Sequence, residues 1–166
     1  MSPLSVHTRR QLGYAEGYLQ LGLKAEAAEA LDEITGGDRD ATPVLAMRLA
    51  VHAERGEWAK ASEAGATVCG REPNVPGFWI QWAYAVRRHA GLPQAREILM
   101  RGVGLHPREA VFHFNLACYE AQLGHLEDAQ VFLDTACGLD ETFTELAKTD
   151  PDLVPLRPEA GQGSGL

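Results

Sequence analysis

Residues 123–129 read Leu123-Gly124-His125-Leu126-Glu127-Asp128-Ala129, and this stretch has counterparts at a regular interval along the chain. A glycine followed by an alanine recurs at Gly22 and Ala27, Gly56 and Ala61, Gly91 and Ala95, and Gly124 and Ala129. The alanines are 34 residues apart at every step, and the glycines are 33 to 35 residues apart. An interval of this size predicts a chain built from four copies of one supersecondary unit.

Each copy has the sequence pattern of two helices joined by a tight turn. Apolar side chains recur three and four residues apart, as in Ala27, Ala30, Leu31 and Ile34, which is the spacing of one helical face. The glycine ends the first helix because it adopts the left-handed conformation at little cost. Proline or polar clusters separate the copies, and no alternating β-branched run predicts a strand. The sequence therefore predicts an all-α protein.

The repeat resembles the tetratricopeptide repeat (TPR), whose 34-residue unit reads W-x2-L-G-x2-Y, then A-x3-F, then P. The third copy matches most fully, at Trp79, Trp82, Ala83, Val86, Ala95, Leu99 and Pro107. Glu120 stands at the tyrosine position of the fourth copy, and Gly65 stands at the large apolar position of the second. The resemblance, to a small bacterial TPR protein, implies a right-handed superhelical solenoid of helix-turn-helix repeats with a C-terminal capping helix.

The expected organisation follows from the repeat boundaries. We expect an N-terminal extension over residues 1–7, four repeats over 8–141, a C-terminal cap over 142–157 and a disordered tail over 158–166. The repeats are expected at about 8–41, 42–75, 76–109 and 110–141. The cap is expected to carry Phe143 and Leu146 inward, and the length of the chain favours one compact domain.

Gly65 marks an expected weak point. Glycine inside a helix costs roughly 1 kcal/mol relative to alanine. We therefore expect Gly65→Ala to stabilise the second repeat, unless a neighbouring side chain already fills the gap.

Composition limits the classes of partner and compartment. Fifteen lysines and arginines against 23 acidic residues give a net charge of −8, which disfavours nucleic acid and anionic membranes as partners. No apolar run approaches the roughly 18 residues of a spanning helix, and Met1–Arg10 lacks the apolar core of a signal peptide. Three cysteines without a CxxC spacing indicate free thiols, and hence a cytoplasmic protein.

The sequence offers no constellation for catalysis. No two of its six histidines lie four residues apart on a helix, and neither a nucleophile elbow nor a phosphate loop is present. We therefore expect a protein that is not an enzyme and has no catalytic residues, cofactor or metal site. The oligomeric state is left open.

The resemblance implies a peptide-binding groove lined by the first helices of successive repeats. Its expected residues are Leu12, Glu16, Ala50, Glu54, Ile80, Tyr84, Arg87, Arg88, Phe114 and Cys118. Tyr84, Arg87 and Arg88 share a helical face, where an aromatic ring and two guanidinium forks could hold an acidic group. The alternative is that the arginines are solvated or tie the next repeat through ion pairs.

These features predict a non-enzymatic protein–protein interaction module, a scaffold that binds a protein or peptide partner. The bound segment could be extended or helical. The alternative function is a dedicated secretion chaperone of the type III, TPR class, which the short length and acidity of the chain also fit.

Overall fold

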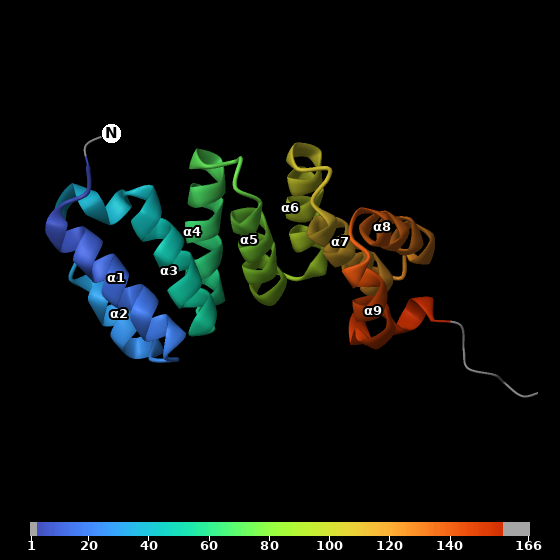
Figure 1. Cartoon of the computed structure of the whole chain (residues 1–166), viewed down its shortest axis with the longest axis horizontal. Helices are drawn as coiled ribbons and strands as arrows, with labels where there is room; N and C mark the ends of the chain where they lie inside the picture. The colour runs from blue at the N-terminus through green and yellow to red at the C-terminus, as the bar shows by residue number, and fades with distance from the viewer. Residues whose placement is uncertain (1–2, 158–166) are drawn as a thin grey trace, which may run out of the picture. The chain divides into compact units, whose positions relative to one another are not determined.

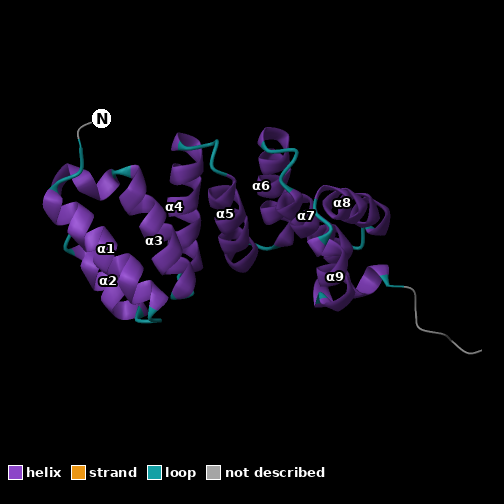
Figure 2. Ribbon diagram, viewed as in Figure 1, coloured by secondary structure: helices purple, strands orange, loops and turns teal. Residues whose placement is uncertain are grey.

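The computed structural model describes residues 3–157, and these form helices and loops without a strand (Figure 2). The described elements are α1 (Val6–Gln20), α2 (Lys24–Asp32), η1 (Gly36–Asp40), α3 (Thr42–Glu54), α4 (Trp58–Arg71), α5 (Pro76–His89), α6 (Leu92–Leu105), α7 (Ala110–Leu123), α8 (Leu126–Leu139), α9 (Thr142–Thr149) and η2 (Pro151–Leu156). The all-α prediction is confirmed. The expected tail over 158–166 lies outside the described residues.

The chain divides into two compact units, Met1–Ile98 and Leu99–Leu166, with the division inside α6. Length alone favoured one compact domain. Two units are compatible with a repeat array, because each repeat in such an array contacts only its neighbours.

Three of the turns between paired helices share the same backbone geometry. Gly22, Gly56 and Gly124 have φ angles of +74°, +71° and +84°, which only glycine adopts without strain. The next residue donates its backbone N–H to the carbonyl five residues earlier, at 2.8 to 2.9 Å: Leu23 to Tyr18, Glu57 to His52 and His125 to Glu120. The predicted helix–turn–helix units therefore form at these three glycines.

In the first unit, the helices pack in chain order (Figure 1). The pairs α1 and α2, α3 and α4, and α4 and α5 are in contact, and α3 also touches α1 and α5. Small residues such as Ala15, Ala27 and Ala61 are fully buried and let the helices approach closely. The first helices of successive repeats consequently lie next to one another.

The N-terminal end of α1 is fixed by Asp38 in η1. The Ser5 hydroxyl accepts the Thr8 N–H at 3.0 Å and caps the helix, which therefore begins at Val6, inside the expected extension 1–7. Asp38 Oδ2 accepts hydrogen bonds from the buried Thr8 hydroxyl at 2.6 Å and from the Ser5 N–H at 3.1 Å. These bonds lower the pKa of Asp38 below its ordinary value.

In the second unit, α9 and η2 cover α7 and α8. The Phe143 ring lies 4.8 Å from the Phe114 ring, as its expected inward position requires. Leu146 is half exposed, so the expectation that it packs inward is wrong. The chain turns back at Asp150, so that η2 packs on α7. Leu153 of η2 is therefore only 1% exposed and provides the apolar packing that was expected of Leu146.

Gly65 is a packing site rather than a gap. A Cβ atom placed on Gly65 would lie 2.8 Å from Cβ of Trp82, closer than real Cβ contacts allow. The indole of the third repeat thus fills the space that a large residue at position 65 would occupy. The exception raised for Gly65→Ala therefore applies, and the substitution is expected to destabilise the protein.

Candidate interaction surface

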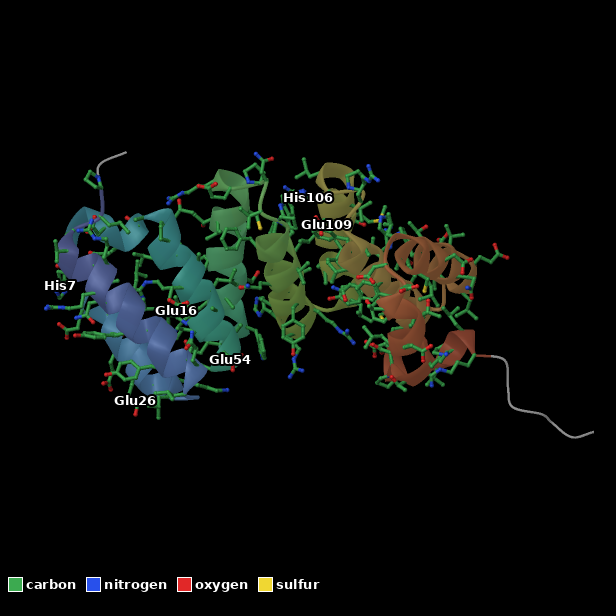
Figure 3. All side chains as sticks on the ribbon, in the orientation of Figure 1. His7, Glu16, Glu26, Glu54, His106 and Glu109 are labelled. Atoms are coloured by element: carbon green, nitrogen blue, oxygen red, sulfur yellow. The ribbon has the colours of Figure 1, made fainter. Side chains whose placement is uncertain are left out.

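The expected groove residues of the first unit fall on α1, α3 and α5. Because α3 contacts both α1 and α5, the three helices present one surface, which we call the inner face. It contains eight of the expected residues: Leu12, Glu16, Ala50, Glu54, Ile80, Tyr84, Arg87 and Arg88. Figure 3 labels Glu16 on α1 and Glu54 at the end of α3, and both side chains are exposed. Leu12, Ala50 and Ile80 are half-buried.

Tyr84 is an exposed aromatic residue with a fixed neighbour. Its side chain is 46% exposed, yet its ring meets the Trp58 ring edge-on at a centroid distance of 5.5 Å. The Arg88 guanidinium lies over the same indole, 5.0 Å from the ring centroid, in cation–π geometry. Arg88 therefore links α5 to α4 of the preceding repeat through a cation–π contact, rather than to the next repeat through an ion pair as the alternative expected. Arg87 is half-buried.

Glu54 makes the equivalent contact one repeat earlier. The Lys24 ammonium lies 3.1 Å from Glu54 Oε2 and donates to the Glu54 carbonyl at 2.6 Å. Lys24 and Glu54 precede Trp58 and Arg88 by one 34-residue period. An ion pair in one place and a cation–π contact in the other thus join the second helix of a repeat to the first helix of the next.

Phe114 and Cys118 do not lie on an open surface in the second unit. They are 7% and 5% exposed, because α9 and η2 pack against α7. The Gln122 side chain donates to the Asp152 carbonyl at 2.9 Å and holds this cover in place. The sequence predicts the cap, but not that the cap covers these two groove positions.

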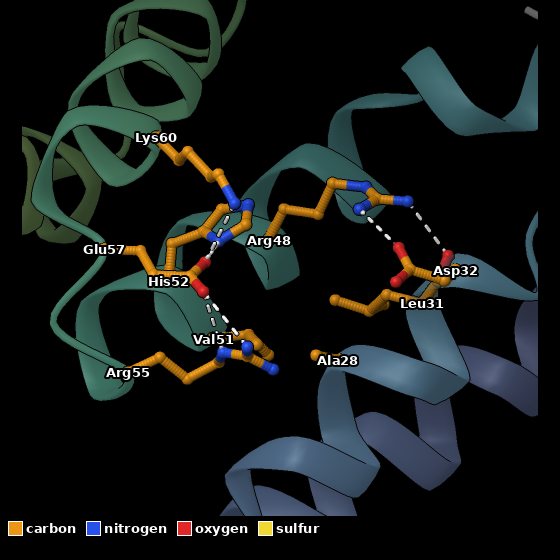
Figure 4. A pocket seen from close by; sticks show the side chains of 9 residues that line it. All are labelled: Ala28, Leu31, Asp32, Arg48, Val51, His52, Arg55, Glu57 and Lys60. Atoms are coloured by element: carbon orange, nitrogen blue, oxygen red, sulfur yellow. Dashed lines mark hydrogen bonds and ion pairs between the residues drawn. The ribbon is translucent and has the colours of Figure 1, made fainter.

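A pocket that the sequence analysis did not foresee lies between α2, α3 and α4 (Figure 4). Its volume is about 280 Å³, and it is lined by Ala28, Leu31, Asp32, Arg48, Val51, His52, Arg55, Glu57 and Lys60. Arg48 and His52 on α3 and Arg55 at its C-cap recur four and three residues apart, so they share one helical face. That spacing is the one signal in the sequence that could have indicated the pocket.

Glu57 is the centre of the ion pairs at this pocket. Its carboxylate lies 2.6 Å from His52 Nδ1, 3.1 Å from the Arg55 guanidinium and 3.5 Å from the Lys60 ammonium. The hydrogen bond with His52, aided by the charges of Arg55 and Lys60, lowers the pKa of Glu57. Glu57 is therefore a carboxylate at neutral pH.

One group of possible metal-ligating atoms occurs among residues 3–157. Cys118, Asp150 and Asp152 place one ligand atom each within 4.8 Å of one another. Asp150 Oδ1 already accepts the Asp152 N–H at 2.9 Å, which caps η2. We interpret these carboxylates as parts of the helix cap.

No protein-family model and no curated protein matches the sequence at a significant level. Solved structures do match. MamA (41-end) from Desulfovibrio magneticus RS-1 has a TM-score of 0.74 at 15% identity, over 81% of this chain and 76% of that one. TTC0263, a thermophilic TPR protein of Thermus thermophilus, has a TM-score of 0.67 at 20% identity, over 85% and 80%. A Podospora anserina kinesin light chain structure with TPR-like repeats has a TM-score of 0.55 at 19% identity, over 91% and 82%.

These likenesses show the tetratricopeptide-repeat fold. The resemblance found in the sequence is thereby confirmed, as is the helical repeat solenoid as fold class. None of the described helices is long and apolar enough to cross a membrane. The secretion-chaperone alternative and the cytoplasmic location stay predictions.

Proposed function

We propose that the chain is a non-enzymatic protein–protein interaction module that holds a peptide segment of a partner protein on the inner face. The repeat fold supports an interaction role, because it presents adjacent first helices as an extended surface. The proposed binding site rests on Tyr84, because its ring is exposed and its position is fixed by contact with the Trp58 ring.

Such a ring has the properties of a binding anchor. A tyrosine offers a large contact area and a hydroxyl group while losing few rotatable bonds on binding. Because Trp58 already restricts the Tyr84 ring at a 5.5 Å centroid distance, little further ordering is needed when a ligand packs on it. Fixed aromatic residues of this kind often dominate the binding energy of an interface.

Helix α3, which lies next to α5, leaves room for a ligand to reach Tyr84. Ala46, Ala50 and Ala53 lie on α3 and are half-buried, so α3 presents mainly small side chains between α1 and α5, with Glu54 at its end. A bound segment can therefore come close to the α3 backbone. Ile80 contributes apolar area beside Tyr84, and Arg87 adds positive charge to α5.

The test compares two tyrosines of similar exposure. Tyr84 is 46% exposed and Tyr14, on α1, is 50% exposed. Tagged wild-type, Tyr84→Ala and Tyr14→Ala proteins are used to capture partners from the lysate of the source organism. We expect Tyr84→Ala to retain at least about tenfold less of the specific partner, with an unchanged helical spectrum, while Tyr14→Ala retains it like the wild type. Equal retention by the two variants would refute the proposed site.

A further inference from the structure

The pocket between α2, α3 and α4 is separate from the inner face. It uses Arg48 and His52 of α3 and Arg55 at the C-cap of that helix, whereas the inner face uses Ala50 and Glu54 of the same helix. Figure 4 shows Arg55, His52 and Lys60 gathered around Glu57 on one side of the pocket, and Arg48 directed to Asp32 on the other. The pocket is therefore a second site in the first unit, with its own chemistry.

The pocket exists because the first repeat has a short second helix. α2 has 9 residues, whereas α4 and α8 have 14 each. Arg48 reaches the exposed end of α2, where its guanidinium donates to the Leu31 carbonyl at 2.9 Å and lies 3.3 Å from Asp32 Oδ1. One period later the same position holds Trp82, whose bulk fills the space over Gly65. An extended arginine in place of an indole leaves the cavity unfilled.

The charges around the cavity favour an added anion. Arg48, Arg55 and Lys60 face two carboxylates, Asp32 and Glu57, so the lining carries one more positive than negative charge in a chain of net charge −8. The side chains of Arg55 and Lys60 are 35% and 65% exposed, and both share Glu57 as their partner. Each has N–H donors left over, because one carboxylate cannot occupy all the donors of a guanidinium, an ammonium and an imidazole.

The floor of the cavity is apolar. Ala28, Leu31 and Val51 line it between the two charged sides; Ala28 is half-buried, and Leu31 and Val51 are each 1% exposed. At about 280 Å³ the cavity lies just below the size range of pockets for drug-sized ligands, so it suits a group of roughly amino-acid size.

We propose that this pocket binds an aliphatic carboxylate, whose acid group pairs with Arg55 and Lys60 while its short hydrocarbon body lies on Ala28, Leu31 and Val51. A guanidinium fork matches the two oxygens of a carboxylate, and the apolar floor selects against bare inorganic anions. The same chemistry is offered by a free short-chain acid and by the last residue of a peptide that ends in leucine.

The test titrates the ¹⁵N-labelled protein with 4-methylpentanoate and follows the backbone amide shifts. Its neutral counterpart 4-methylpentanamide and inorganic phosphate serve as comparison probes. We expect saturable shifts confined to α2, α3 and α4, with at least tenfold weaker binding of the amide and of phosphate. Equal binding of acid and amide, phosphate binding as tight as the acid, or no saturable shift would each overturn the proposal.

Variants provide an independent readout. Lys60→Gln and Arg55→Gln are each expected to weaken 4-methylpentanoate binding about tenfold. The matched control is Lys148→Gln, since Lys148 also pairs with a glutamate three residues earlier and its side chain is 62% exposed. The control and Tyr84→Ala are expected to bind like the wild type. Equal weakening by Lys148→Gln would mean a general charge effect and would overturn the assignment.

Two peptides identify the source of the carboxylate. Acetyl-Gly-Gly-Leu with a free C-terminus is compared with the same peptide amidated, under the same titration. Tighter binding of the free-acid peptide than of 4-methylpentanoate supports a peptide terminus as the source, and the reverse order supports a free acid. Equal binding of the two peptides contradicts carboxylate recognition.

Discussion

His125 Nδ1 lies 2.6 Å from Glu120 Oε2 and bridges the turn between α7 and α8. Two periods earlier the same two positions hold the pair with the residue types exchanged, since His52 Nδ1 lies 2.6 Å from Glu57 Oε2. In the first repeat these positions are Tyr18 and Leu23. The same turn geometry is thus bridged by a hydrogen-bonded Glu–His pair in two repeats, whereas Tyr18 and Leu23 occupy these positions in the first.

The Glu120–His125 pair is expected to contribute to stability. Glu120 is fully buried, and Glu120→Gln would disrupt the 2.6 Å hydrogen bond between its Oε2 and His125 Nδ1. We expect that substitution to lower the free energy of unfolding by about 1.5–3 kcal/mol. In a double-mutant cycle with His125→Gln, measured by urea unfolding, the two losses should be non-additive by at least about 0.5 kcal/mol. Additive losses would show that the two residues act independently.

Gly65→Ala is expected to destabilise the protein by about 1–3 kcal/mol, because its Cβ would collide with Trp82. Gly70→Ala in the same helix is the control, since a Cβ there meets no other atom within 4 Å. That substitution should be neutral or stabilise by up to about 1 kcal/mol. Thermal unfolding of the two variants separates overpacking from helix propensity. A stabilised Gly65→Ala protein would contradict the observed packing.

Acidic pH is expected to lower the stability of the folded protein by protonating Asp38. Its native pKa lies below the ordinary value of 3.8, because the Thr8 hydroxyl and the Ser5 N–H donate to the carboxylate. The folded state therefore favours the ionised form, so the contribution is fully present above the unfolded pKa. It is lost as the pH falls through the lower native pKa. The pKa values of Glu57 and Asp140 are also lowered, so their contributions to stability are likewise lost as the pH falls.

The measurement is urea unfolding of wild-type and Asp38→Asn proteins between pH 6 and pH 2.5. We expect the wild type to lose stability more steeply below about pH 4, and the two curves to converge at the acidic end. Parallel curves over the whole range would show that Asp38 contributes nothing to the pH dependence.

Arg88 is expected to act mainly on stability. Removing its guanidinium in Arg88→Ala takes away the cation–π contact with Trp58, at a cost of about 0.5–1 kcal/mol at this exposed site. A melting curve of Arg88→Ala beside the wild type measures the contribution of the contact. If Arg88→Ala melts like the wild type, the contact does not tie the repeats.

The sequence predicted the repeat well because small residues and glycine turns are local requirements. Ala27, Ala61, Ala95 and Ala129 recur with the period that helix pairing demands, and Gly22, Gly56 and Gly124 do adopt left-handed turns. The Trp79 indole donates to the Pro73 carbonyl at 3.0 Å, and His113, one period later, makes the same contact with Pro107 at 2.8 Å. The motif thus preserves an interaction even where the residue type changes.

The sequence was a poorer guide wherever a contact depends on residues from another element. Phe114 sits at a groove position, but the cap covers it, and no local pattern shows how far η2 folds back. Gly65 looks like a weak point until Trp82 is placed over it. Arg48 gains its role only because α2 ends early at Asp32.

The most direct test of the interaction surface is site-specific photo-crosslinking in cells of the source organism. A benzoylphenylalanine replaces Ala50 or Tyr84 on the inner face, and Glu63 or Thr67 on the exposed side of α4 in the control proteins. The inner-face account predicts a discrete crosslinked partner from Ala50 and Tyr84, and none from Glu63 and Thr67. The same partner crosslinked from α4 but not from positions 50 and 84 would contradict it.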